Sequence, residues 1–297
     1  MKIAVIGLGK MGFNLARNIS MKFDVAAFDI DAQRVNDLKK YNIYATTDLS
    51  ALIEKLPEQK IVWLMVPAGN VIDSILAELK HLLKKGDIII DGGNSFYKDS
   101  IRRGLDLADS GIGYLDCGTS GGQDAALTGV CTMVGGNSSD YEICKNLFEH
   151  ISVDGGHVFT GESGSGHFVK MVHNGIEYGM MQSIAEGFEL MDRSGFNLNL
   201  ADVAETWNNG SVIRSWLIEL TAKIFKNSHK LEEIAGVVGA SGEGEWTVNT
   251  AMEMKVPVPA ISAAINSRLF SQQSDHLSHK VLAALRNEFG GHSVEKK

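Results

Sequence analysis

The sequence predicts an α/β domain with a mainly parallel sheet, followed by an all-α domain built on one long helix. In the first half of the chain, short apolar segments rich in β-branched residues alternate with helical patterns, as in a parallel sheet covered by helices on both faces. After Gly164, one helical pattern continues to about Ser194. A chain of 297 residues is long enough for two domains. We therefore expect domains at residues 1–162 and 163–297.

The composition is that of an ordinary globular protein, with 44% hydrophobic and 22% charged residues. A net charge of −8 argues against binding to nucleic acid or to an anionic membrane surface, because both need an excess of Lys and Arg. No apolar run approaches the roughly 20 residues that span a bilayer. We expect a cytoplasmic protein in which a local cluster of positive groups holds any anionic ligand.

The cysteines and histidines outside the main motifs give no metal-binding pattern. Cys117, Cys131 and Cys144 are odd in number and lack the paired spacing of metal ligands. His276 and His279 lie three residues apart, but no carboxylate and histidine signature surrounds them. We expect the three cysteines to be reduced residues in or near the core, and we expect no metal site.

The first motif joins a strand, a glycine-rich turn and a helix. The segment KIAVI is followed by GLGKMG and then by a helical pattern to about Ser20. In this G-x-G-x-x-G pattern, Gly7 permits the tight turn, Gly9 lets a pyrophosphate approach the backbone, and Gly12 lets the helix pack close to the strand. The helix N-terminus then faces the phosphates. This context predicts a Rossmann dinucleotide-binding domain with the candidate residues Gly7, Leu8, Gly9, Lys10, Met11 and Gly12.

A second strand, DVAAFDI, places a carboxylate where the ribose of a dinucleotide is read. Asp29 stands near the end of this strand, at the distance from the glycine turn that is typical of a ribose-binding acid. Its carboxylate can accept hydrogen bonds from both ribose hydroxyls and would repel a 2′-phosphate, and the next arginine is Arg34. We therefore expect NAD rather than NADP. The alternative is a turn carboxylate without a ligand.

Three further strands are each followed by residues suited to ligand binding. The strands are expected at residues 60–66, 87–91 and 114–117. Open α/β sheets bind ligands at the carboxyl ends of their strands. Any one of these loops could be a plain surface turn, but three at one sheet edge favour a site. The candidates in the loops are Val66, Pro67, Asn94, Ser120, Gly121 and Gly122.

The long helix carries four polar side chains among apolar neighbours. Lys170, His173, Asn174 and Glu177 stand at positions i, i+3, i+4 and i+7, so they share one helix face. One interpretation is a solvated face with opposite charges. The other is a catalytic row, because burial makes a lysine a usable base near neutral pH and a carboxyl a usable acid.

Together, GLGKMG, DGGNS, TSGG, K-x-x-H-N-G-x-E-Y and the C-terminal R-x-x-F-G-x-H resemble decarboxylating 6-phosphogluconate dehydrogenase, in its short NAD-dependent type. The broader β-hydroxyacid dehydrogenase superfamily shares the glycine turn, the SGG loop and the lysine. The resemblance covers nearly the whole chain. It implies oxidative decarboxylation of 6-phosphogluconate to ribulose 5-phosphate and CO₂ with reduction of NAD, a step of the pentose phosphate pathway.

The resemblance also implies a role for each residue of the helix row. Lys170 would take the proton of the C3 hydroxyl, and Glu177 would protonate the enediol that remains after CO₂ is lost. His173 and Asn174 would position the substrate hydroxyls, with Asn94, Ser120, Gly121 and Gly122 on the substrate and nicotinamide side. The phosphate would be held by Tyr178, Thr247, Arg268, Arg286 and His292.

The resemblance implies an oligomer as well. In this family the C-terminal tail, here with Arg286 and His292, reaches into the neighbouring subunit's site, so we expect a homodimer or tetramer. One position departs from the family pattern: Glu245 in GEGEWT stands where the family usually has Lys or Arg contacting the phosphate. Either Glu245 points away or the substrate preference is altered.

Two other functions compete with this interpretation. A 3-hydroxyacid dehydrogenase of the same superfamily, such as one acting on 3-hydroxyisobutyrate, would oxidise without decarboxylation, but Glu177, Tyr178 and the tail RNEFGGH argue against it. A non-catalytic nucleotide-sensing protein would keep the glycine turn but gives no reason for Lys170 and Glu177 on one helix face.

Overall fold

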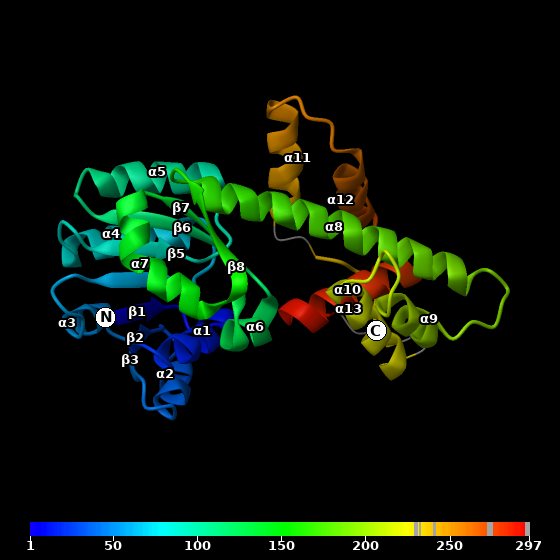
Figure 1. The fold of residues 1–297 in the computed structure, drawn as a ribbon, viewed down its shortest axis with the longest axis horizontal. Coiled ribbons are helices and arrows are strands. Elements are labelled where there is room, and N and C mark those ends of the chain that lie inside the picture. Colours follow the sequence, from blue (N-terminus) through cyan, green and yellow to red (C-terminus); the bar gives the residue numbers. More distant parts are fainter. Residues whose placement is uncertain (229–230, 232, 240–241, 272–275, 295–297) are drawn as a thin grey trace. The chain divides into compact units, whose positions relative to one another are not determined.

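The computed structural model describes residues 1–228, 231, 233–239, 242–271 and 276–294. The chain forms two compact units, residues 1–171 (unit 1) and 172–297 (unit 2). The long helix α8 (Ser165–Asp192) begins in unit 1 and ends in unit 2 (Figure 1). Its 28 residues confirm the long helix that the sequence predicts. We keep the domain boundary after residue 162 as a prediction, because α8 belongs to both units.

Unit 1 contains one eight-stranded sheet in the order β3-β2-β1-β4-β5-β6-β7-β8. All neighbouring strands are parallel except β6 and β7, which confirms the mainly parallel sheet. The sequence predicted five of these strands and did not identify β3, β7 and β8. The bounds are β1 (Lys2–Ile6), β2 (Asp24–Phe28), β3 (Tyr44–Thr46), β4 (Ile61–Leu64), β5 (Ile88–Asp91), β6 (Gly113–Ser120), β7 (Val130–Gly136) and β8 (Ser152–Gly161).

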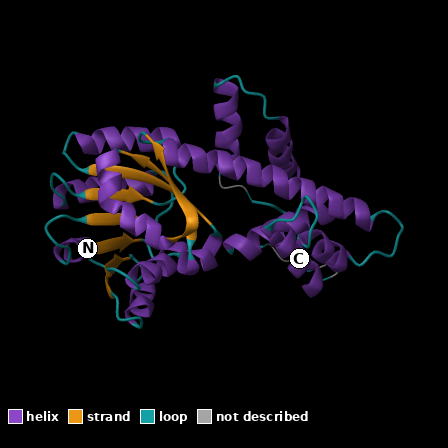
Figure 2. Cartoon of the chain, viewed as in Figure 1, coloured by secondary structure: helices purple, strands orange, loops and turns teal. Residues whose placement is uncertain are grey.

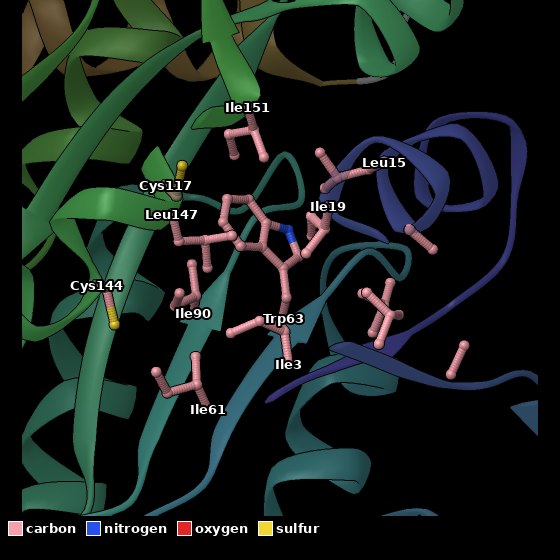
Figure 3. Packing of buried hydrophobic residues seen from close by; sticks show 14 of the residues in the cluster. Ile3, Leu15, Ile19, Ile61, Trp63, Ile90, Cys117, Cys144, Leu147 and Ile151 are labelled. Carbon is pink, nitrogen blue, oxygen red and sulfur yellow. The ribbon is translucent and has the colours of Figure 1, made fainter. Parts of the chain in front are cut away.

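The central strands read as continuous apolar runs because both of their faces are covered. Successive side chains of a strand point to opposite faces of the sheet. In β4, Ile61 and Trp63 therefore join one hydrophobic core (Figure 3), whereas Val62 and Leu64 join a second core on the other face. The helices of unit 1 that cover the faces are α1 (Lys10–Ser20), α2 (Ala32–Lys39), α3 (Leu49–Glu54), α4 (Asn70–Leu82), α5 (Tyr97–Ala108), α6 (Gly122–Thr128) and α7 (Ser138–Ile151).

The cysteines only partly follow the expectation of core positions. Cys117 and Cys144 are fully buried, and burial raises the pKa of the Cys144 thiol to about 12. Cys131 is exposed, so its expected core position was wrong. The reason is strand alternation, because in β7 the neighbours Val130 and Thr132 are both buried and Cys131 points the other way. All three are free thiols.

Within the described part of unit 2 all the regular elements are helices, as the sequence predicts (Figure 2). Its core gathers aromatic rings: Phe188 of α8 stacks on Phe225 at 5.1 Å and meets the edge of Trp207 at 5.6 Å. Among the described residues, no helix combines the length and apolarity needed to cross a bilayer. The helices are the part of α8 from Val172 onward, α9 (Leu200–Asn208), α10 (Trp216–Asn227), α11 (Glu243–Glu253), α12 (Pro259–Ser271) and α13 (Leu277–Gly290).

Candidate active site

The three glycines of the first turn have different surroundings. A Cβ atom on Gly7 would lie 2.5 Å from the Met65 carbonyl oxygen, and one on Gly12 would lie 1.9 Å from the carbonyl oxygen of Gly7. A Cβ on Gly9 would meet only the Arg34 guanidinium at 4.0 Å. Gly7 and Gly12 therefore serve close packing, while Gly9 leaves space at the N-terminus of α1. This opening suits the pyrophosphate of a dinucleotide, which the helix N-terminus attracts.

The sequence-predicted ribose carboxylate lies beside this turn. Asp29 is buried, and its carboxylate accepts hydrogen bonds from the backbone N–H of Leu8 at 2.6 Å and of Asp31 at 2.8 Å. These two donors fix the carboxylate at the carboxyl end of β2. Arg34 Nη1 lies 3.6 Å from Asp29 Oδ2, and the Arg34 side chain is half exposed. Sequence reasoning did not propose Arg34 for this site; its position in the first turn of α2 was the available signal.

The loops after β4 and β5 meet at the same edge of the sheet. A Cβ on Gly93 would lie 3.0 Å from the Val66 carbonyl oxygen, and one on Gly7 would lie 2.9 Å from Val66 Cγ1. Val66 thus lies between the glycine turn and the loop after β5. Pro67 and Asn94, on these two loops, are both exposed. The structure brings the three predicted cofactor segments of unit 1 together.

Lys170 lies directly over β6, close to the predicted glycine-rich loop. A Cβ on Gly118 would lie 2.3 Å from the Lys170 Cβ, so the helix backbone approaches the strand where no side chain stands. Ser120 ends β6 two residues later, and Gly121 and Gly122 turn the chain into α6 with φ of +127° and +78°. Lys170 is 7% exposed. Lys170 and the Ser120–Gly122 loop therefore belong to one region of unit 1.

A buried carboxylate sets the position of this helix. Asp116 of β6 is fully buried and accepts hydrogen bonds from the backbone N–H of Gly164 at 2.6 Å and of His167 at 2.8 Å. The first N–H groups of a helix have no intrahelical acceptor, and a carboxylate there also complements the helix dipole. A Cβ on Gly166 would lie 2.3 Å from the Asp116 carbonyl oxygen. The start of α8 is thus held against the sheet.

The remaining residues of the helix row lie on the next turns of α8, in unit 2. His173 Nδ1 lies 3.2 Å from Asn174 Oδ1 and 3.8 Å from Glu177 Oε2. Asn174 is 7% exposed, and the Glu177 side chain is 20% exposed. The burial of Lys170 and Asn174 argues against a fully solvated face. The row presents an amine, an imidazole, an amide and a carboxyl along one helix.

A buried arginine marks the predicted phosphate end in unit 2. The Arg268 guanidinium carbon lies 3.3 Å from the centre of the Tyr178 ring, and Arg268 Nη1 donates to the Gly239 carbonyl oxygen at 3.4 Å. Among the described residues, no hydrogen-bond acceptor reaches Arg268 Nη2. Burial lowers the pKa of Arg268 to about 10, so the guanidinium remains charged at neutral pH. A cation that keeps a donor without a partner is suited to an anionic ligand.

Other predicted phosphate residues lie around Arg268. Arg286 is buried, and its Nη1 would lie 3.5 Å from a Cβ on Gly239, the residue whose carbonyl accepts from Arg268. The first turn of α11, with Thr247 following it, packs on the Tyr178 ring through Gly244. His292 instead follows the C-terminal end of α13, where its carbonyl oxygen accepts from Asn287.

Two carboxylates also belong to this region of unit 2. Glu243 is buried and its charge acts on Arg268, whereas Glu245, two residues later in α11, is exposed. Sequence reasoning singled out Glu245 and did not propose Glu243, because burial of one side of a helix start is not visible in GEGEWT. Within the described residues, no group of three or more His, Cys, Asp or Glu side chains could hold a metal ion.

Comparisons with known proteins agree with this architecture. Residues 2–161 match the family model of the NAD binding domain of 6-phosphogluconate dehydrogenase, and residues 166–288 match the model of its C-terminal domain. The chain is 48% identical to the Bacillus subtilis (strain 168) protein named "Putative 6-phosphogluconate dehydrogenase YqeC", with all of both chains covered. It is 40% identical to the NAD(+)-dependent, decarboxylating 6-phosphogluconate dehydrogenase of Haloferax volcanii, over all of this chain and 99% of the relative.

A solved structure of Plasmodium falciparum 6-phosphogluconate dehydrogenase, described in its apo form and in complexes with NADP+ and with 6-phosphogluconate, also matches. The two proteins are 34% identical with a TM-score of 0.85. The match covers 91% of this chain and 62% of that chain, so the chain spans less than two thirds of that longer protein.

The contact between Gly118 and Lys170 predicts the effect of one added methyl group. In Gly118→Ala the new Cβ overlaps the Lys170 side chain, so α8 must shift away from β6. We expect a loss of about 1–3 kcal/mol in the free energy of unfolding, measured by chemical denaturation. Gly179→Ala, in α8 with no atom within 4 Å of the new Cβ, is the matched control and should gain about 0.5–1 kcal/mol. Equal stabilities of the two variants would contradict the close approach.

Proposed function

The chain belongs to the 6-phosphogluconate dehydrogenase family, and we propose that it oxidises and decarboxylates 6-phosphogluconate with NAD. The products are ribulose 5-phosphate, CO₂ and NADH. The observation that carries the proposal is the burial of Lys170 on Gly118 of β6, near the Ser120–Gly122 loop, at the head of a row that ends in Glu177. Full-length similarity to the Haloferax enzyme supports the same reaction.

Lys170 acts first as the base. Its amine takes the proton of the C3 hydroxyl as a hydride leaves C3 and a ketone forms there. A nicotinamide ring, when bound, supplies the hydride acceptor. The burial of Lys170 keeps water away from its amine, so the proton passes between Lys170 and the substrate oxygen.

The carbon–carbon bond is then broken without a metal. The C1–C2 electron pair moves into the C3 ketone as CO₂ leaves, and the ketone oxygen takes back the proton from Lys170, which gives an enediol. Glu177 protonates C2 of this enediol, and Lys170 removes the proton of the C3 hydroxyl so that the ketone of ribulose 5-phosphate forms. Because His173 and Asn174 stand between the two residues in the row, we assign them to the substrate hydroxyls.

The phosphate of the substrate is assigned to the cationic group of unit 2. Arg268 and Arg286 are both buried and converge on Gly239, and Arg268 Nη2 is a donor for which the described part of the chain offers no acceptor. The face of the Tyr178 ring packs on the Arg268 guanidinium, and Thr247 of α11 is assigned to the phosphate as well. His292 is assigned to the same ligand from the end of the chain.

NAD is the proposed cofactor, and Asp29 is the residue that favours it. A carboxylate fixed beside the glycine turn accepts from ribose hydroxyls and repels a 2′-phosphate. Arg34 favours NADP instead. Its guanidinium lies 3.6 Å from the same carboxylate, and its positive charge reduces the repulsion of a 2′-phosphate. The relatives differ in this respect: the Haloferax enzyme is named NAD(+)-dependent, and the Plasmodium structure contains NADP+.

We also propose a homo-oligomer, dimer or tetramer, and the surface of unit 2 supports it. Large apolar side chains are exposed on several helices of unit 2, and exposed apolar surface can mark an interface between protein chains. Because Arg286 lies beside Gly239 of its own chain, we propose that the tail reaches the neighbouring subunit's site through its end, with His292. The exposed side chains are Ile176 and Met180 of α8, Met252 of α11, Met254 and Val256 after it, and Leu269 and Phe270 of α12.

The reaction is tested with purified protein, 6-phosphogluconate and either NAD or NADP. We expect reduced nicotinamide and CO₂ in equal amounts, with NAD as the better cofactor. Reduced nicotinamide without CO₂ would favour the alternative 3-hydroxyacid dehydrogenase.

In Lys170→Met, turnover should fall about 10³-fold, while NAD binding and the unfolding midpoint stay close to those of the wild type. Turnover that survives in this variant would remove Lys170 from the mechanism.

Cofactor choice is tested at Asp29. In Asp29→Asn the negative charge is lost while the side chain keeps its size, so a 2′-phosphate is no longer repelled. We expect the ratio of kcat/KM for NAD to that for NADP to fall about tenfold, which corresponds to ~1.4 kcal/mol. Asp24→Asn, at the opposite end of β2, is the control and should leave the ratio unchanged. The same ratio in both variants would show that Asp29 does not select the cofactor.

The departure at Glu245 is tested by restoring a positive charge. Because Glu245 is exposed, water and salt screen its charge, and we expect only a modest effect. Glu245→Lys should lower the KM for 6-phosphogluconate about two- to fivefold at low ionic strength, and the gain should shrink as salt is added. Glu253→Lys, at the far end of α11, adds the same charge as a control. A KM that is unchanged at low salt would mean that Glu245 does not face the phosphate.

A further inference from the structure

We propose that Arg103 is a positioning residue that holds the loop after β4 and the loop after β5 together, and so fixes the nicotinamide side of the dinucleotide site in unit 1. Arg103 lies in α5 and is only 2% exposed. It is not itself placed to touch a ligand. The inference rests on the proposed assignment of Val66, Pro67 and Asn94 to the cofactor.

The guanidinium of Arg103 donates to three separate segments. Arg103 Nη2 donates to the carbonyl oxygen of Gly69, at 3.2 Å, which ends the loop after β4. Arg103 Nη1 donates to Ser95 Oγ at 3.3 Å, in the loop after β5. Arg103 Nε donates to Asp73 Oδ1 of α4 at 2.9 Å. One planar group thus sets the spacing of two loops and one helix.

A second buried group completes the connection on the β5 side. Asp91 is fully buried, and its Oδ2 accepts from Ser95 Oγ at 2.8 Å and from the Tyr114 hydroxyl at 2.9 Å. Its Oδ1 accepts from the backbone N–H of Gly93 at 3.2 Å. Arg103 Nη1 lies 3.8 Å from the same carboxylate. The loop that carries Asn94 is therefore held on both sides of Asn94, at Gly93 and at Ser95.

The two loops are in direct contact at the other end as well. Gly93 packs on the carbonyl oxygen of Val66, and Val66 packs on Gly7 of the glycine turn. A shift of the Gly69 or Ser95 end would therefore move Val66 and Asn94 relative to the turn that receives the pyrophosphate. Misplacement of a reacting group by about 1 Å can cost about a hundredfold in rate.

The neighbouring Arg102 forms an exposed ion pair with the same aspartate and serves as a comparison for Arg103. Arg102 also binds Asp73, through Nη2 at 2.9 Å, but its side chain is 57% exposed and it donates to neither loop. The hydrogen bond from Arg103 is the largest reason that the pKa of Asp73 lies below its usual range. Arg102 and Arg103 therefore share a partner and differ in their reach to the loops.

The experiment compares Arg103→Met with Arg102→Met in the full chain. Both variants lose one positive charge near Asp73, but only Arg103→Met releases Gly69 and Ser95. We expect the dissociation constants of NAD and NADH, measured by titration, to rise about tenfold in Arg103→Met, with kcat about a hundredfold lower. In Arg102→Met both should change less than twofold. A third variant, Arg103→Lys, keeps the charge and one hydrogen bond but cannot bind both loops at once.

A merely structural role gives a different result. Arg103→Lys would then recover the unfolding midpoint together with NAD binding and kcat, and this outcome would overturn the proposal. Recovery of the midpoint without recovery of NAD binding supports it. If Arg103→Met does not fold, Arg103→Lys and Ser95→Ala still give the comparison. NAD and NADH titrations need no substrate, so a wild type that binds nucleotide but does not turn over 6-phosphogluconate would refute the proposed reaction and leave this test valid.

Discussion

The contact between the Asp116 carboxylate and the start of α8 is the interaction on which the candidate site of unit 1 depends. Both donors are backbone N–H groups at the beginning of a helix, and both bonds are charge-assisted. Hydrogen bonds to a charged group contribute about 1.5–3 kcal/mol each. Because Asp116 is fully buried, leaving it without these donors would cost at least as much. Sheet and helix therefore hold each other, and Lys170 follows one turn later.

The start of α8 is also held against the sheet by close approach of the backbones, which glycine residues permit. Gly118, Gly135 and Gly166 stand where β6, β7 and α8 meet, and a Cβ on any of them would overlap a neighbour. In the glycine turn, a Cβ on Gly7 or Gly12 would overlap protein atoms, whereas a Cβ on Gly9 would overlap none. These glycines thus have two uses: most of them let protein atoms approach closely, and Gly9 leaves open space at the N-terminus of α1.

Much of unit 1 could be predicted because its central strands are apolar on both faces and follow clear turn signals. Strand β8 could not, since every residue of SVDGGHVFTG is partly or fully exposed and two adjacent glycines stand in its first half. The residues of the candidate site on α8 were found because helical spacing is visible in sequence. Arg103 and Glu243 were missed for a different reason. The loop partners of Arg103 depend on the packing of separate segments and the environment of Glu243 depends on burial, and periodicity carries neither kind of information. Arg34 is a different case, because its partner Asp29 is close in sequence.

The two most buried arginines show how the same side chain can serve structure or ligand. Arg103 has acceptors for its Nε, Nη1 and Nη2 atoms, and the carboxylates of Asp73 and Asp91 surround it. Its donors are used within the protein, so it can hold loops but offers little to a ligand. Arg268 lies on the ring face of Tyr178, which attracts a cation without neutralising it, and its Nη2 has no acceptor among the described residues. A buried cation with an unused donor is stabilised further by an anion, because the anion supplies the acceptor that the described residues do not and adds its charge to that of Glu243.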